Sequence, residues 1–321
     1  MPDQDRKLPR MGNALPRLAR TLVSPLRRDV SRRFDQMVET LSRRIDHSRV
    51  VYCGGHEVLT RVRNGRRIYL DMRDTAVAPM IALGQDYEPD VAAALREVAH
   101  PGDNFFDVGA NFGYHSLLLA PLLANGSHAL HLFEPNPDVF RCLRRTIHAN
   151  GMWSDVTLNQ IALSDHPGTA PLSVFEDFWG GATLGTQSQH EASEHPWAEY
   201  TTVEQTVEIP TTTLDEYCAQ HGVESIDLMK IDTEGHEEAV FSGMRQVIDR
   251  SPDLRIVLEF TFGAYTDPAR FWEQLTSDFP HRFFVSRQGA LDRVGDLEEL
   301  GSKTDFELVN VVLSRVPIPS R

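Results

Sequence analysis

Short apolar runs alternate with amphipathic stretches over most of the chain, and this pattern predicts strands alternating with helices. Seven runs have the length and apolar content of buried strands: 104–108, 129–133, 156–161, 226–231, 255–260, 281–286 and 306–314. Apolar positions at helical spacing separate most of them: 114–124, 137–150, 212–221, 236–249 and 268–278. The alternation predicts an α/β fold with a Rossmann-like, doubly wound, mostly parallel seven-stranded sheet. A short connection through Gln288-Gly289 suits a reversed final strand.

A small cap is expected before this sheet. Residues 58–70 alternate in polarity around Asn64-Gly65, which is the strongest short-range signal for a β-hairpin. A helix is expected over 89–99. The chain is therefore divided into an N-terminal segment, a hairpin–helix cap and a domain that carries the sheet, at residues 1–50, 51–100 and 101–321.

The N-terminal segment differs in charge from the rest of the chain. Residues 1–49 hold 12 Lys and Arg against 6 Asp and Glu, whereas the remainder holds 20 against 40. Its apolar residues recur at helical spacing: Leu15, Leu18, Leu22, Leu26, Val30, Phe34, Val38, Leu41 and Ile45. A basic amphipathic helix predicts peripheral docking on an anionic membrane surface or on a partner protein. The alternatives are self-association into a homo-oligomer and packing on its own domain.

Composition limits the remaining classes of protein. The net charge of −14 argues against general binding of nucleic acid. No apolar run approaches the ~20 residues of a membrane span, and the first residues lack the apolar core of a signal peptide. Cys53, Cys142 and Cys218 are widely spaced, which predicts free thiols and a cytoplasmic protein. If the basic segment docks on a membrane, the expected surface is its inner face.

A glycine-punctuated turn is the most informative chemical feature. The expected strand 104–108 carries Asp107 near its end, and Gly109 and Gly113 then lead into an apolar helix. The next expected strand ends at Glu134, a position from which an acid reaches the hydroxyls of a ribose. Strand, glycine turn, helix, strand and acid together predict a βαβ unit that binds a nucleotide.

The pattern of the turn favours a cationic nucleoside over a dinucleotide. A dinucleotide fingerprint has the form G-x-G-x-x-G, whereas this turn reads D-x-G-x-x-x-G with Asn111 at the middle position. Asp107 would repel a pyrophosphate, but it suits S-adenosylmethionine, which carries an ammonium and a sulfonium. A nicotinamide site and a turn without any ligand remain the alternatives.

Four separated motifs, in order, resemble those of the FkbM-type methyltransferases. They are DVGANFGY at 107–114, FEPNP at 133–137, QIALSD at 160–165 and DLMKIDTEGHE at 227–237. The resemblance runs from about residue 56 to residue 315, and the middle position of the glycine turn is Asn in that family too. It implies a class I methyltransferase that uses S-adenosylmethionine, usually acting on hydroxyl oxygens of sugars or secondary metabolites.

The cofactor site expected on this basis lies within 101–321. Its residues are Asp107, Gly109, Ala110, Asn111, Gly113, Tyr114, Ser116, Glu134, Pro135, Asn136, Ile161, Ala162 and Asp232. An aromatic insertion at about 175–205 follows the third expected strand and suits the apolar face of a sugar ring. The acceptor is expected to contact Trp179, Gly181, Trp197 and Tyr200. The alternative for this insertion is a surface hairpin that packs on the rim of the sheet.

Methyl transfer to a hydroxyl also needs alignment of the reactants and an acceptor for one proton. His236 is the first candidate base and His115 the second, with Asp232 and Glu234 shaping the site. Carboxylates beside His236 are expected to raise its basicity. Lys230 is expected to be a buried partner of a carboxylate rather than a catalytic group.

A metal mechanism is the alternative to a histidine base. Asp232, Glu234 and Glu259 follow or end expected strands, and three such carboxylates can hold Mg²⁺. Two other classes of protein stay open. One is a nicotinamide-dependent oxidoreductase, disfavoured because the chain lacks a Tyr-x-x-x-Lys pair. The other is a non-catalytic scaffold that keeps the fold. No motif identifies the acceptor.

Overall fold

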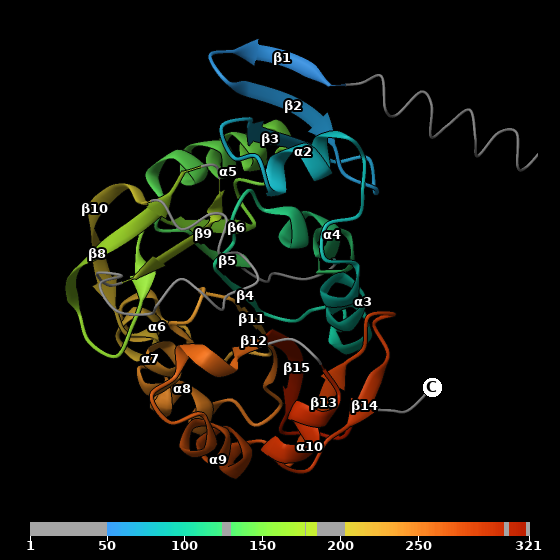
Figure 1. The fold of residues 1–321 in the computed structure, drawn as a ribbon, viewed down its shortest axis with the longest axis vertical. Helices are drawn as coiled ribbons and strands as arrows, with labels where there is room; N and C mark the ends of the chain where they lie inside the picture. Colours follow the sequence, from blue (N-terminus) through green and yellow to red (C-terminus); the bar gives the residue numbers. More distant parts are fainter. Residues whose placement is uncertain (1–49, 124–129, 177, 185–202, 305–307, 319–321) are drawn as a thin grey trace, which may run out of the picture. The chain divides into compact units, whose positions relative to one another are not determined.

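The central element of the structure, a computed structural model, is an eight-stranded sheet (Figure 1). The structure describes residues 50–123, 130–176, 178–184, 203–304 and 308–318. The strand order is β14-β13-β15-β12-β11-β4-β5-β6. The bounds are Phe105–Val108 (β4), Leu130–Phe133 (β5), Val156–Asn159 (β6), Leu228–Ile231 (β11), Arg255–Thr261 (β12), His281–Val285 (β13), Leu291–Arg293 (β14) and Leu308–Ser314 (β15).

The directions of the strands confirm the expected doubly wound sheet. β6, β5, β4, β11 and β12 are joined in parallel pairs. β15 is antiparallel to both β12 and β13, which makes it the reversed strand that the short connection suggested. β14 was not expected and forms a hairpin with β13 at one edge. The chain order changes direction on either side of β4, so the switch point lies beside the glycine turn.

Helices cover both faces of the sheet. Adjacent residues of β4 point to opposite faces, because Phe105 belongs to one hydrophobic cluster and Phe106 to the other. One face carries α2 (Val77–Ala82), α3 (Pro89–Val98), α4 (Tyr114–Leu123) and α5 (Pro137–Ala149). The other carries α6 (Leu214–His221), α7 (Glu237–Ser242), α8 (Arg245–Arg250), α9 (Pro268–Asp278) and α10 (Leu297–Ser302). A 3₁₀ turn, η2, spans Phe262–Ala264.

The expected hairpin is present and belongs to a three-stranded sheet. β1 (Val51–Gly54), β2 (Glu57–Arg61) and β3 (Arg67–Asp71) pair antiparallel in the order β1-β2-β3. Ile68 and Leu70 of β3 are fully buried and share the hydrophobic cluster of α4 and α5. The hairpin is therefore packed on the helical layer of the sheet domain.

Three local predictions need correction. The helix expected over 236–249 is two helices, α7 and α8, because the chain breaks at Gly243, whose backbone lies close to the carbonyl of Ser164. The short helix α2 was not expected. Described residues before, within and after the aromatic insertion form a second sheet that was not expected, in the order β7-β10-β8-β9, whereas residues 185–202 of the insertion lie outside the described residues. Its strands are Ala162–Leu163 (β7), Gly168–Phe175 (β8), Phe178–Leu184 (β9) and Val203–Thr212 (β10).

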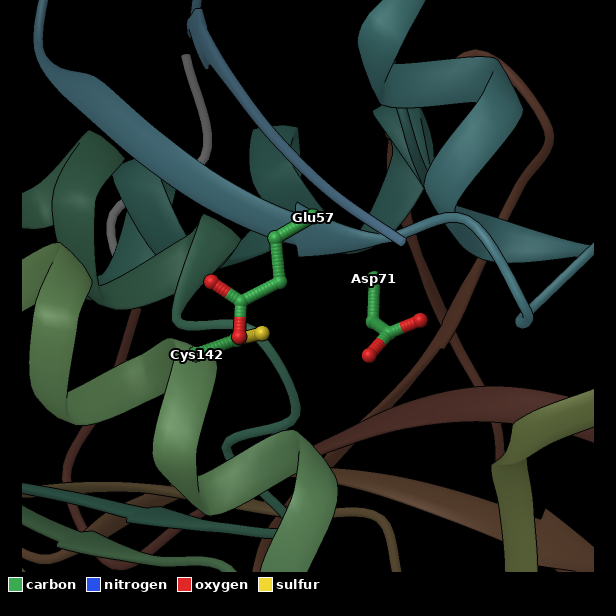
Figure 2. A group of neighbouring side chains, drawn as sticks. All are labelled: Glu57, Asp71 and Cys142. Atoms are coloured by element: carbon green, nitrogen blue, oxygen red, sulfur yellow. The ribbon is translucent and has the colours of Figure 1, made fainter. Parts of the chain in front are cut away.

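Two carboxylates and a thiol, Glu57, Asp71 and Cys142, lie together between the cap hairpin and α5, and we call them the cap cluster (Figure 2). Arginines pair with its two carboxylates and tie the hairpin to α5. Arg141 contacts Glu57 at 2.9 Å and Asp71 at 3.1 Å. Arg73 contacts Asp71 at 2.8 Å, and Arg145 contacts Glu57. Burial alone would raise the pKa of Asp71, but the hydrogen bonds and charges of Arg73 and Arg141 bring it below its ordinary value.

Some predictions lie outside the described residues. They include the amphipathic N-terminal segment, Trp197 and Tyr200. The described residues belong to one structural unit, Arg49–Arg321. Within the described part of the chain, no helix is both long and apolar enough to cross a membrane.

Candidate active site

A cleft of about 840 Å³, including its open mouth, lies beside the switch point of the sheet. The turns that follow β4, β5 and β11 form its floor, and residues of α2 and β9 form a wall. Ligands of open α/β sheets bind at this place, outside the carboxyl ends of the strands. The predicted cofactor residues that line the cleft are Gly109, Ala110, Asn111, Tyr114, Glu134, Pro135, Ile161, Ala162 and Asp232.

The glycine turn is held tightly against the neighbouring strands. Gly109 has φ +79°, and a Cβ there would lie 1.8 Å from the carbonyl oxygen of Asp232, so only glycine fits. The N–H groups of Gly109 and Ala110 both donate to the carbonyl of Phe133, at 3.1 and 2.9 Å. The turn is thus pinned between the ends of β5 and β11.

Glu134 follows β5 and faces this turn, as the spacing predicted. Its two carboxylate oxygens accept hydrogen bonds from the backbone N–H of Asn111 (2.9 Å) and of Asn136 (2.8 Å). Burial raises the pKa of Glu134 to about 7, although these two bonds and the charge of Lys230 oppose the rise. Each oxygen keeps a second lone pair, so the carboxylate can still accept hydrogen bonds from a ligand.

Asp107 lies below the cleft rather than on its surface. Its Oδ2 accepts a hydrogen bond from Ser116 Oγ at 2.6 Å, and its Oδ1 has no hydrogen-bond partner among the described residues. Burial raises its pKa against the opposing charge of Lys230. Asp107, Gly113, Ser116 and Asn136, which were also predicted for the cofactor site, therefore do not line the cleft.

Lys230 is the buried partner of a carboxylate, as expected. Its Nζ lies 2.8 Å from Oδ2 of Asp232 and 3.2 Å from the carbonyl oxygen of Gly109. Burial opposes its charge, but the surrounding carboxylates, Asp232 first among them, raise its pKa. The lysine therefore stays charged and ties the end of β11 to the glycine turn.

The two candidate bases both line the cleft, and each already has a partner. His115 Nε2 lies 2.7 Å from Glu88 Oε2, and His236 Nε2 lies 3.0 Å from Ser164 Oγ. Glu88 is a partner that the sequence did not reveal, because it precedes α3, 27 positions from His115.

The expectation that carboxylates make His236 more basic was wrong. Its immediate neighbour Glu237 is fully buried and points elsewhere, accepting hydrogen bonds from the backbone N–H of Thr233 and from the hydroxyl of Tyr265. Burial lowers the pKa of His236, and the charge of Asp165 offsets this only in part. Burial therefore favours the neutral form of this imidazole.

Asp232, Glu234 and Glu259 meet at the ends of β11 and β12, and we call them the strand-end cluster. One carboxylate oxygen of each lies within 4.8 Å of the others. Burial, and then the charge of Asp232, raise the pKa values of Glu234 and Glu259 well above the ordinary range. Asp232 and Glu234 line the cleft. The structure therefore brings together the three acids that the metal alternative named.

The wall made by α2 and β9 was not anticipated, and buried Asp74 organises it. Asp74 Oδ1 accepts a hydrogen bond from the backbone N–H of Val77 at the start of α2, at 2.6 Å. Its Oδ2 accepts from the N–H groups of Trp179 and Gly180 in β9, at 3.2 and 3.1 Å. A Cβ on Gly180 would lie 2.8 Å from Asn111 Nδ2, so β9 runs directly over the glycine turn.

The predicted acceptor residues differ in whether they line the cleft. Trp179 lines the cleft, but its side chain is only 3% exposed, and the guanidinium of Arg73 lies 4.3 Å from the ring centroid. Gly181 does not line the cleft, although Gly180 and Ala182 do. Arg73 therefore packs against one face of the Trp179 ring, and the role of Trp179 in acceptor binding stays a prediction.

Strand order, glycine turn and buried acid together define a class I methyltransferase fold. A family model, the methyltransferase FkbM domain, matches residues 107–287. Because this match covers more than half of the chain, the chain belongs to the FkbM methyltransferase family.

Curated relatives agree with this assignment. The 2-O-methyltransferase NoeI of Sinorhizobium fredii is 25% identical over 182 residues, which cover 54% of this chain and 68% of NoeI. The 31-O-demethyl-FK506 methyltransferase FkbM of Streptomyces tacrolimicus is 30% identical over 162 residues, 45% of this chain and 60% of that protein. The hexuronic acid methyltransferase AglP of Haloferax volcanii is 29% identical over 161 residues, 50% and 58% respectively. The matches to the last two thus span less than two thirds of those relatives.

Proposed function

We propose that this chain is an S-adenosylmethionine-dependent O-methyltransferase that acts on a hydroxyl of a sugar, a glycan or a hydroxylated secondary metabolite. The observation that carries the proposal is Glu134, a buried carboxylate that ends β5 and faces the glycine turn at the switch point. A carboxylate in this place accepts hydrogen bonds from ribose hydroxyls. The names of two relatives, a 2-O-methyltransferase and a 31-O-demethyl-FK506 methyltransferase, support oxygen as the methyl acceptor.

The charge of the cleft supports a cationic cofactor over a nicotinamide dinucleotide. Three acids line the cleft: Glu134, Asp232 and Glu234. Lys230 also lines it, but its charge is paired with Asp232. A pyrophosphate at the glycine turn would face the carboxylate of Glu134 and have Asp107 beneath it. The sulfonium and ammonium of S-adenosylmethionine would instead be attracted by these carboxylates.

In the proposed reaction an acceptor oxygen forms a bond to the methyl carbon. The bond between that carbon and sulfur breaks, its electron pair goes to sulfur, and the acceptor's proton passes to a base. We assign the base to His236, which lines the cleft and is only partly buried, and whose neutral form burial favours. His115 is 5% exposed and paired with Glu88, which suits a positioning residue better.

The test is transfer of label from methyl-labelled S-adenosylmethionine by the full-length protein to fractionated glycans and hydroxylated small molecules. We expect label in an ether linkage, which resists the alkaline hydrolysis that removes methyl esters. Binding of S-adenosylmethionine and of NAD is measured in parallel. Saturable binding of NAD with no binding of S-adenosylmethionine would overturn the proposal.

A further inference from the structure

The strand-end cluster is formed by two neighbouring parallel strands that present acids at the same edge of the sheet. Ile231 pairs with Leu258 in the register of β11 and β12, so Asp232 and Glu259 are the next residues along each strand. Glu234 follows in the turn after β11, where it adopts a positive φ of 54°. This placement brings the three carboxylates to within 4.8 Å of one another.

Glu259 adds an observation that is independent of this grouping. Its side chain is nine-tenths buried, and its Oε2 has no hydrogen-bond partner among the described residues. Leaving a buried carboxylate oxygen without a partner is costly, and native structures usually satisfy such groups with protein, water or an ion. The oxygen is therefore an unfilled acceptor beside two further carboxylates.

Among the described residues, one protein cation is bonded to this group of three carboxylates, and it pairs with Asp232 alone. Lys230 is bonded to Asp232, and its charge is shared with Asp107 and Glu88. The nearby Glu237 adds negative charge, although its own oxygens are engaged by Thr233, Gly235 and Tyr265. By contrast, three arginines contact the cap cluster, which has similar geometry. The strand-end cluster therefore has three carboxylates against the single cation Lys230, and Glu234 and Glu259 have no ion pair among the described residues.

We propose that Asp232, Glu234 and Glu259 bind a divalent cation with hard-ligand preference, such as Mg²⁺ or Mn²⁺. Opposite ligands of a Mg²⁺ ion lie about 4.2 Å apart and adjacent ones about 3 Å, so the observed spacing requires little movement. Three carboxylate oxygens leave positions for water or for acceptor oxygens. Because Asp232 and Glu234 line the cleft, the ion can hold two neighbouring hydroxyls of the acceptor and acidify one. This role rests on the proposed function, whereas the binding of the ion does not.

Binding of Mn²⁺ to the full-length protein without cofactor tests the site, with paramagnetic resonance and calorimetry as readouts. We expect one saturable site in the wild type and an affinity that falls about tenfold or more in Glu259→Gln and in Glu234→Gln. Asp71→Asn, which changes an acid of the cap cluster, is the matched control and should bind as the wild type does. The Glu259→Gln side chain is isosteric and breaks no hydrogen bond among the described residues, so it should remain folded.

Two results would overturn the cation site: no saturable Mn²⁺ binding at millimolar concentration, or equal affinity in the wild type and both strand-end variants. Methyl transfer that is insensitive to EDTA and to Glu259→Gln would overturn the role in holding the acceptor. Failure of the proposed function has a different signature. In that case Mn²⁺ would bind in a Glu259-dependent manner, while S-adenosylmethionine would neither bind nor donate its methyl group.

Discussion

The cap cluster and the strand-end cluster hold acids at similar spacing, but they have opposite electrostatic surroundings. In the cap, Asp71 is 1% exposed and contacts two arginines, and its pKa lies below the ordinary value. At the strand ends, Glu259 is similarly buried without a hydrogen-bonded cation among the described residues, and its pKa lies well above the ordinary range. Grouped acids therefore do not by themselves indicate a ligand site. The number of internal counter-cations distinguishes the two clusters: three arginines contact the two carboxylates of the cap cluster, whereas only Lys230 is ion-paired with the three carboxylates at the strand ends among the described residues.

Glu134 is an intermediate case that supports this interpretation. It has two backbone N–H donors and no hydrogen-bonded cation, and its pKa rises to about 7. Hydrogen bonds thus offset part of the burial cost, and ion pairs offset more of it in the cap. The acids whose burial remains unfavourable lie in and beside the cleft, where the positive charge of a cofactor or a metal ion would offset the cost of burying them.

The largest expected effect is on turnover. Glu259→Gln should lower the rate of methyl transfer by about 10²–10³, because a bound cation contributes several kcal/mol of charge stabilisation. His236→Ala should lower it by about 10²–10⁴ with cofactor affinity near normal, the effect of losing a general base. Asp71→Asn should leave turnover unchanged at temperatures where it is folded. Single-turnover assays with these variants check this, and chelator-insensitive activity with His236→Ala near wild type would contradict it.

The next largest effect is on stability, and here Asp71→Asn should be the more harmful of the two substitutions. Asp71→Asn should reduce the free energy of unfolding by about 1–2 kcal/mol, because it breaks ion pairs whose arginines are partly screened by solvent. Glu259→Gln, measured without divalent cations, should be as stable as the wild type or more so. Urea denaturation monitored by circular dichroism checks both. Equal losses in the two variants would remove the distinction between the clusters.

Added Mg²⁺ should stabilise the variants of the two clusters to different extents. At a hundredfold excess over its dissociation constant, a ligand that binds only the folded state stabilises by about 2.7 kcal/mol. We expect this gain in the wild type and in Asp71→Asn, whereas a tenfold or greater loss of affinity limits the gain in Glu259→Gln to about 1.4 kcal/mol or less. Denaturation curves with and without the ion provide the measurement. A gain of equal size in all three proteins would place the ion elsewhere.

The smallest expected effect is a pH dependence that comes from Glu134. Its pKa is raised from 4.5 to about 7, so between these values the folded state binds more protons than the unfolded state. Its contribution to stability is therefore complete below pH 4.5 and is lost as the pH rises through about 7. Cofactor affinity should change in the opposite direction, rising between about pH 6 and 8 as the carboxylate ionises. Calorimetric titrations should show this slope in the wild type and a flatter profile in Glu134→Gln; identical profiles would contradict the assignment.

Local patterns were sufficient to predict the sheet and the position of the glycine turn. Asp107, Gly109 and Glu134 occupy adjacent strand ends because each follows a short apolar run, and the carboxyl ends of parallel strands share one edge. The hairpin around Asn64-Gly65 followed from turn chemistry in the same way. Where sequence spacing determines spatial proximity, residue-level prediction succeeded.

The partners of the catalytic candidates could not be predicted, because they come from distant parts of the chain. Glu88 reaches His115 from the turn before α3, and Asp74 reaches β9 across 105 positions. The basicity of His236 was misjudged for a related reason. Proximity in sequence suggested that Glu237 would act on it, whereas the start of α7 directs that carboxylate to Thr233 and Tyr265. Burial and side-chain direction are tertiary properties that spacing alone does not contain.

Binding of S-adenosylmethionine in the cleft beside Glu134 is best tested by calorimetric titration of the 321-residue protein. We predict saturable binding of S-adenosylmethionine and none of NAD. We also predict a loss of about 1–3 kcal/mol in Glu134→Ala, from the removal of charge-assisted hydrogen bonds. Unchanged affinity in a folded Glu134→Ala variant, or preferential binding of NAD by the wild type, would contradict the account.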